Sequence, residues 1–205
     1  QAIGVGSKYL CSVTQSGAKD VEEVSGLVGE LGRKYAARYQ YWMGKLQAPF
    51  GANVMPNLRV CGYARSSVER IKPDLINAHW IDHGFLTEKS LRLLNKPVVW
   101  TLHDMSPISG GFGYRLSGNN ISMNDFTYQD HRRGASERLI RWKKKQLRDV
   151  NLTVIAPSQW LGREALNSPV FEGKKIVVIP YGVNTAIFSP KNPRILREAF
   201  NIHDD

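Results

Sequence analysis

Short apolar segments alternate with longer amphipathic ones along most of this chain. Four of the short segments are almost wholly apolar and are bounded by polar or turn-forming residues, a pattern typical of strands buried on both faces of a sheet. They cover residues 75–79, 98–102, 152–156 and 176–179. Near the N-terminus, residues 7–13 predict one further short strand.

The longer segments carry apolar residues at steps of three and four, which is the spacing of one helical face. The predicted helices cover about 28–46, 60–72, 86–94, 134–149 and 157–168. Pro73 and Pro97 follow two of them, and the residue before a proline rarely continues a helix. Residues 104–134 are rich in Gly, Ser and Asn and predict a long loop.

Strands that alternate with helices imply βαβ units and therefore a parallel sheet. Right-handed crossovers then give a Rossmann-like α/β fold with helices on both faces of the sheet. Ligands of such sheets bind beyond the carboxyl ends of the strands. The candidate positions are the residues that follow each strand: His79 and Trp80, His103 and Asp104, Pro157 and Ser158, and Tyr181 and Gly182.

Several site classes lack their sequence signature here. The chain has no GxGxxG turn, no GxxxxGK[ST] loop and no GxSxG elbow, which argues against a nicotinamide-binding domain, a P-loop NTPase and an α/β-hydrolase. His79 and His83 have the spacing of a zinc pair, but His79 ends a predicted strand and no HExxH sequence is present. Cys11 and Cys61 are too few for a four-cysteine zinc site. We therefore expect no metal.

The net charge points to an anionic partner. Lys and Arg number 28 against 18 Asp and Glu, a formal charge of +10, which favours nucleic acid, anionic lipid headgroups or phosphorylated small molecules. Residues 131–148 hold eight of these cations and only one acidic residue. Because aromatic residues are not interleaved with them and no nucleic-acid-binding motif is present, we expect no nucleic-acid partner.

The basic segment has two interpretations. Leu139 and Trp142 can face the core while the cations lie on the outside as an ordinary solvated face. Alternatively, Lys143, Lys144 and Lys145 contact an anionic membrane surface.

His103 is the strongest single candidate for chemistry. It follows a fully apolar strand at the ligand-binding edge of the predicted sheet. A histidine there can donate to a sugar hydroxyl or a phosphate oxygen, and its charge is adjustable near neutral pH. The alternative is a structural turn made by His103 and Asp104.

Four segments in order resemble the bacterial glycosyltransferases of family 4. They are PDLINAHWI at 73–81, KPVVWTLHDM at 96–105, NLTVIAPSQWL at 151–161 and VIPYGVNT at 178–185. Gly110 and Gly111 follow the second segment, and Phe188 and Pro190 follow the fourth, as in that family. The resemblance covers roughly residues 70–190.

The resemblance implies one half of a GT-B architecture, in which two Rossmann-like domains face each other across a cleft. Residues 1–190 would form the N-terminal, acceptor-side domain, without its first strand and the Gly-rich turn that follows it. Residues 191–205 would be the link towards a donor domain absent from this sequence. On this interpretation the isolated chain is not expected to transfer sugar.

The function implied is retaining transfer of a sugar from a nucleotide-sugar donor to a saccharide or lipid-linked acceptor, in bacterial surface polysaccharide biosynthesis. The family needs no metal or other cofactor. We expect a cytoplasmic location, and peripheral attachment to the inner face of the membrane stays open. The alternative is a non-catalytic Rossmann-like domain that binds an anionic ligand or partner.

The resemblance also assigns site residues. His103 matches the histidine that reaches into the cleft near the transferred sugar, and it is the predicted catalytic residue. Asp104 is expected to orient the loop, and Gly110 and Gly111 match a flexible stretch beside the site. With Ser158, at the edge of the third strand, these residues complete the predicted substrate-binding set.

The predicted hinge departs from the family pattern. Gly182 and Asn184 match its hinge-side turn, where Asp is usual in place of Asn184. Ser106 stands where a Trp is common. These departures leave the acceptor open.

Overall fold

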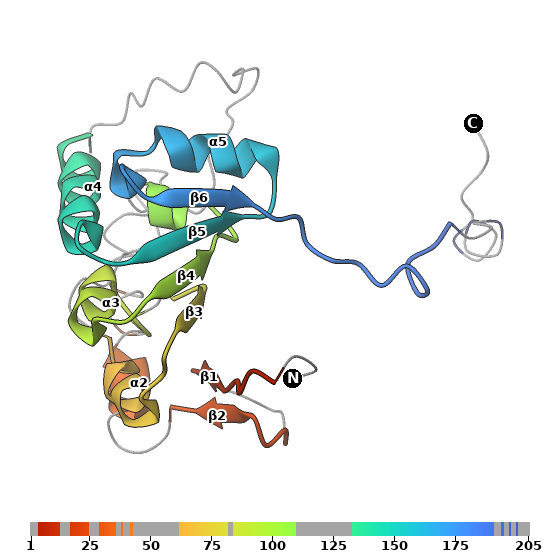
Figure 1. Ribbon diagram of the computed structural model, residues 1–205, viewed down its shortest axis with the longest axis horizontal. Coiled ribbons are helices and arrows are strands. Elements are labelled where there is room, and N and C mark those ends of the chain that lie inside the picture. Colours follow the sequence, from red (N-terminus) through yellow and green to blue (C-terminus); the bar gives the residue numbers. More distant parts are fainter. Residues whose placement is uncertain are drawn as a thin grey trace.

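A four-stranded parallel sheet forms the centre of the molecule (Figure 1). The computed structural model describes residues 4–12, 17–24, 29–35, 38, 42, 62–81, 84–109, 133–190, 194, 197 and 200. The strands lie side by side in chain order: β3 (Ile76–His79), β4 (Val98–Thr101), β5 (Leu152–Ala156) and β6 (Lys175–Val178). Each neighbouring pair is parallel. The predicted α/β class and parallel sheet are therefore confirmed.

Helices connect these strands. They are α2 (Arg65–Ile71) before β3, α3 (Glu88–Leu94) before β4, α4 (Arg133–Leu147) before β5 and α5 (Gln159–Asn167) before β6. Two 3-10 turns, η2 (Ser106–Ile108) and η3 (Pro169–Phe171), follow β4 and α5.

Side-chain caps fix where two helices begin. The hydroxyl of Thr87 accepts from the backbone N–H of Ser90 at 3.1 Å and starts α3. The hydroxyl of Ser158 accepts from the N–H of Leu161 at 3.2 Å and starts α5. Such caps satisfy backbone donors that have no partner within the helix.

The two faces of the sheet differ in burial. Trp100, Val154 and Ala156 point to one face and are buried, whereas the alternate residues Val99 and Ile155 are only half-buried. Helix α5 lies close to the buried face. A Cβ atom on its Gly162 would stand 2.8 Å from Cγ2 of Val178, so only glycine permits this approach.

A second, two-stranded parallel sheet precedes the main one. It pairs β1 (Tyr9–Cys11) with β2 (Val21–Glu23). The N-terminal strand was predicted from the sequence, but β2 was not, because Val-Glu-Glu shows no apolar alternation. The hydroxyls of Ser12 and Tyr63 lie 2.6 Å apart, and Arg33 donates to the carbonyl of Ser12 at 2.9 Å. The first contact ties the small sheet to the segment before α2, and the second ties it to the helical residues 29–35.

Of the other predicted boundaries, the start of the second helix differs. Residues 29–35 are helical within the predicted helix 28–46, and much of the remainder lies outside the described residues. The helix predicted to begin at residue 60 begins at Arg65, after a turn in which Gly62 adopts a φ of 125°. After β6 the segment 179–190 runs away from the sheet (Figure 1).

Candidate active site

Three side chains from separate strand ends meet at the carboxyl edge of the main sheet. His79 ends β3, His103 lies two residues beyond β4, and Tyr181 lies three residues beyond β6. Nδ1 of His79 is 2.9 Å from Nε2 of His103, and the Tyr181 hydroxyl is 2.7 Å from Nδ1 of His103. The three polar rings therefore form one hydrogen-bonded chain.

The sheet register explains why the two histidines meet. In the parallel pair, His79 stands opposite Thr101. Side chains two residues apart point to the same face, so His103 follows Thr101 on the side of His79. The N–H of Leu102 donates to the carbonyl of Ile155 at 2.9 Å, which carries the extended conformation to the residue before His103.

The electrostatics of the pair favour an uncharged His79. Partial burial lowers the pKa of the His79 imidazole, and the neighbouring His103 lowers it further. Two protonated rings 2.9 Å apart would repel each other, so at neutral pH His79 is neutral and can accept or donate a hydrogen bond.

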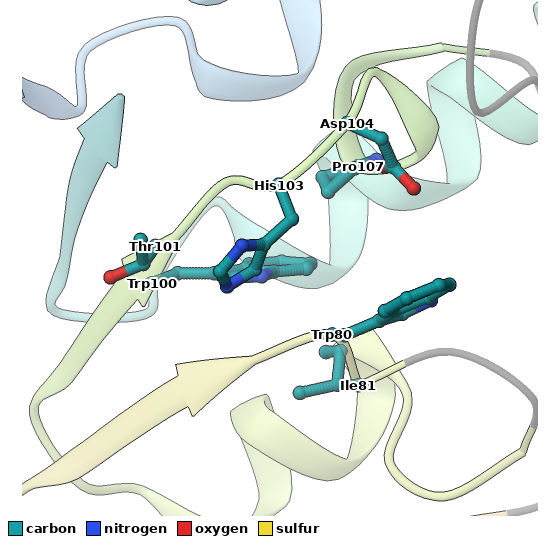
Figure 2. Close-up of a pocket in the computed structure, with 7 residues that line it drawn as sticks. All are labelled: Trp80, Ile81, Trp100, Thr101, His103, Asp104 and Pro107. Atoms are coloured by element: carbon teal, nitrogen blue, oxygen red, sulfur yellow. The ribbon is translucent and has the colours of Figure 1, made fainter. Parts of the chain in front are cut away.

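A small pocket opens beside these rings. It is lined by Trp80, Ile81, Trp100, Thr101, His103, Asp104 and Pro107 (Figure 2). The lining comes from the segments that follow β3 and β4 and from the end of β4 itself. Figure 2 shows the imidazole of His103 between these two segments, with the indole of Trp80 alongside the pocket. The pocket has apolar walls with a few polar groups and is a shallow hollow at the sheet edge.

Trp80 has an unusual backbone. Its φ is 38°, in the left-handed region that side chains other than glycine rarely adopt. Among the described residues, the other two non-glycine residues with positive φ, Lys72 and Asn95, are ordinary helix C-caps. Trp80 is also 56% exposed. A large aromatic side chain held in a strained, exposed position next to a pocket is a feature of functional sites.

Asp104 shapes the turn that follows His103. Its side chain is buried, and Oδ1 accepts from the backbone N–H of Ser106 at 2.8 Å. This bond holds Ser106, the first residue of the 3-10 turn η2. The geometry is that of a carboxylate that orients a loop, with the imidazole of His103 left on the exposed side.

The side chain of Lys143 hydrogen-bonds to the same turn. Its Nζ donates to the carbonyl of Ser106 at 2.5 Å and to that of Ser109 at 3.3 Å. Oε1 of Glu88 lies 3.8 Å from this Nζ, and the two side chains are 0% and 4% exposed. The ammonium thus connects α4, α3 and the loop that carries His103.

The prediction that Lys143 lies on the outer, membrane-facing surface of its helix is wrong. Leu139 and Leu147, four residues before and after it, are both buried, so helical geometry turns Lys143 inward with them. That spacing was readable in the sequence. The run of three lysines concealed it, because Lys144 and Lys145 are indeed exposed.

The remaining predicted residues lie in other places. Ser158 caps α5, and its hydroxyl accepts from the N–H of Leu161. Gly182 and Asn184 are exposed in the segment after β6, and Oδ1 of Asn184 accepts from the N–H of Ala186 at 3.0 Å. Gly110 and Gly111 lie outside the described residues.

His79 and Tyr181 were predicted to lie at the sheet edge but were not among the predicted site residues. The signal was their place directly after strands; their contact with His103 depends on strand order. Among the described residues, no group of three or more His, Cys, Asp or Glu side chains is placed to hold a metal ion. Within the same part of the chain, no helix is long and apolar enough to cross a membrane.

Comparison with protein families identifies residues 14–187 as a match to the sequence model described as Glycosyltransferase Family 4. The match begins well before residue 70, so it extends further towards the N-terminus than the four segments that carry the resemblance. Neither the curated proteins nor the solved structures contain a match.

Proposed function

The chain belongs to glycosyltransferase family 4, and from this premise we propose that it forms the acceptor-side domain of a retaining glycosyltransferase. The reaction would transfer a sugar from a nucleotide sugar to a saccharide or lipid-linked acceptor in bacterial surface polysaccharide biosynthesis. The observation that carries the proposal is the position of His103. It stands at the carboxyl edge of a parallel sheet, beside a pocket, where such folds bind their ligands.

His103 has the chemistry that glycosyl transfer requires. The transition state has oxocarbenium-like character, and oriented hydrogen bonds to the sugar stabilise it as charge develops. The imidazole is exposed and held by neighbours on both ring nitrogens, so it is oriented before substrate arrives. In this proposal His103 donates to, or accepts from, a hydroxyl of the transferred sugar.

Trp80 would receive the acceptor. A pyranose ring has an apolar face of C–H groups. Packing this face against an aromatic ring removes apolar surface from water. The indole lies beside the pocket and is more than half exposed. We place the acceptor sugar against this ring, with its reacting hydroxyl towards His103.

The donor would bind to a second domain, as the family architecture implies. In this proposal the acceptor domain alone does not bind both substrates. Much of the rate enhancement in such reactions comes from holding both substrates in one closed cleft. The proposal therefore expects transfer from a protein that includes both domains and not from the 205-residue chain alone.

Membrane attachment would use the outer face of α4. Arg138, Arg141, Lys144 and Lys145 are exposed there, and Arg148 is exposed directly after the helix. Three of these cations have acidic neighbours: Glu137 for Arg141, Glu172 for Lys144 and Asp149 for Arg148. The hydrogen bond from Lys144 lowers the pKa of Glu172. The excess of positive charge on this face is thus smaller than the sequence alone indicated. Cations still outnumber the acidic residues there, which favours contact with an anionic lipid surface.

The experiment that tests the proposal is sugar transfer by the two-domain protein. Radiolabelled UDP-, GDP- and dTDP-hexoses are supplied as donors, with a bacterial lipid extract as the source of acceptors. Label entering the organic phase in a manner that requires His103 supports the proposal. Label transfer that is unchanged in the His103→Ala protein contradicts the role given to His103.

A further inference from the structure

Both ring nitrogens of His103 already have partners from its own chain. Nε2 faces Nδ1 of His79 at 2.9 Å, and Nδ1 faces the Tyr181 hydroxyl at 2.7 Å. A substrate hydroxyl that bonds to this ring must therefore replace one of the two or share a nitrogen with it. Which nitrogen carries the proton decides what the ring offers to that hydroxyl.

The Tyr181 hydroxyl indicates where the proton lies. It is also 3.4 Å from the carbonyl oxygen of Leu102, which can only accept. If the phenol proton is directed to this carbonyl, the phenol oxygen accepts from Nδ1–H of His103. Nε2 of the neutral ring is then unprotonated and accepts from Nδ1–H of His79.

We infer that Tyr181 is a positioning residue that fixes neutral His103 as its Nδ1–H tautomer and leaves Nε2 as a hydrogen-bond acceptor. Neutral histidine in water prefers the opposite, Nε2–H form, so the protein has to impose this state. His79 completes the arrangement, and its lowered pKa agrees with a neutral ring that donates from Nδ1.

The catalytic meaning of this inference rests on the proposed function. With Nε2 unprotonated, His103 accepts a hydrogen bond from a sugar hydroxyl once that hydroxyl takes the place of His79. The oxygen of the hydroxyl then gains electron density, which suits a group that must stabilise positive charge nearby.

Tyr181 also connects His103 to a distant part of the chain. The two rings are nearly parallel, with an interplanar angle of 13° and centroids 5.8 Å apart. The segment after β6 runs away from the sheet (Figure 1). Tyr181 belongs to this segment and is 57% exposed. A displacement of this segment that carries Tyr181 with it would release Nδ1 of His103 and allow the ring to change tautomer.

The test reads the tautomer directly. Long-range ¹H–¹⁵N correlation spectra of imidazole rings distinguish Nδ1–H, Nε2–H and doubly protonated histidine, and the chain has only five histidines to assign. The His103 signals are assigned with a His103→Gln variant. At a pH where the ring is neutral, we expect the Nδ1–H pattern in the unmodified chain and the Nε2–H pattern in Tyr181→Phe. Phe keeps the stacked ring and removes only the hydroxyl.

The matched control is Tyr9→Phe, in β1 and also exposed, which should leave the His103 pattern unchanged. An Nε2–H pattern in the unmodified chain, or the same tautomer before and after Tyr181→Phe, overturns the inference. The measurement needs no substrate. A Tyr181-dependent tautomer together with failed sugar transfer would therefore reject the proposed function and keep the inference. Sugar transfer together with a tautomer that does not depend on Tyr181 would keep the proposed function and reject the inference.

Discussion

Nζ of Lys143 lies 2.5 Å from the carbonyl oxygen of Ser106, and this bond joins the middle of α4 to the turn that follows the candidate catalytic histidine. The ammonium is fully buried and faces the buried carboxylate of Glu88. A charge in such a place is tolerated only when it is paired and hydrogen-bonded. The stability of the site loop therefore depends on this lysine, and the consequence is measurable.

Lys143→Met should lower the free energy of unfolding by about 3–5 kcal/mol, because the substitution leaves the Glu88 carboxylate buried without its cation. Urea unfolding followed by circular dichroism measures the loss. The double variant Lys143→Met with Glu88→Leu should be more stable than Lys143→Met alone, since both charges are then gone. Lys145→Met, on the exposed side of the same helix, is the control and should change stability by no more than about 0.5 kcal/mol. Equal losses at Lys143 and Lys145 would contradict the buried pair.

His103→Ala in the two-domain protein should reduce sugar transfer by about 10²- to 10³-fold, the usual cost of one oriented hydrogen bond to a developing charge. Its melting temperature should stay close to that of the unmodified protein, because the imidazole is exposed. Initial rates with a matched nucleotide sugar, together with a thermal melt, separate the two effects. Turnover of the variant within a few-fold of the unmodified protein would show that His103 has no catalytic role.

Asp104 should respond differently to two substitutions. Asp104→Asn keeps an oxygen that can accept from the N–H of Ser106, so transfer should fall only a few-fold. Asp104→Ala removes that acceptor and leaves the N–H unpaired in a buried turn, which should cost about 1–3 kcal/mol of stability. Rates and melting curves of both variants test this. A large loss of turnover in Asp104→Asn at unchanged stability would instead indicate that the carboxylate acts on substrate.

Binding of the two-domain protein to anionic vesicles should depend on the exposed lysines of α4. Each cation near such a surface contributes about 1 kcal/mol at most, so Lys144→Gln with Lys145→Gln should weaken binding by no more than about 30-fold. Flotation with vesicles of phosphatidylglycerol and phosphatidylcholine, at two salt concentrations, measures it. Lys19→Gln with Lys34→Gln removes two exposed cations elsewhere and serves as the control. If both double variants float alike, α4 has only a solvated face.

The pH dependence of stability should report on His79. Its pKa in the folded chain is below the ordinary 6.5, so the unfolded chain binds this proton more tightly. Stability should therefore fall as the pH is lowered from about 6.5 towards the folded pKa, and the His79 contribution should vanish above that window. His79→Gln should show a smaller loss between pH 7.5 and pH 5.5 in urea unfolding. The same pH slope in both proteins would exclude His79 as its source.

Much of the fold was predictable from residue order alone. The inner strands of a parallel sheet are covered on both sides and are largely apolar, so residues 98–102 and 152–156 are recognisable as strands from their side chains alone. Each of the four predicted strands lies within two residues of its observed bounds. β2 was not predicted because two of its three residues are glutamates. It forms a strand through its pairing with β1.

The sequence by itself determined the class of fold and the family, and it predicted the sheet edge at which the candidate residues lie, because each of these follows from a local pattern or a contiguous motif. The tertiary structure alone decided which edge residues meet. His103 is 24 positions from His79 and 78 from Tyr181. The pairing of β3 with β4 brings the two histidines together, and the course of the chain after β6 brings Tyr181 to His103. The same holds for Lys143. A run of charges looks solvent-exposed in the sequence, whereas α4 packs against α3 and η3 and buries the Lys143 ammonium, which donates to the carbonyl of Ser106 beside the candidate site.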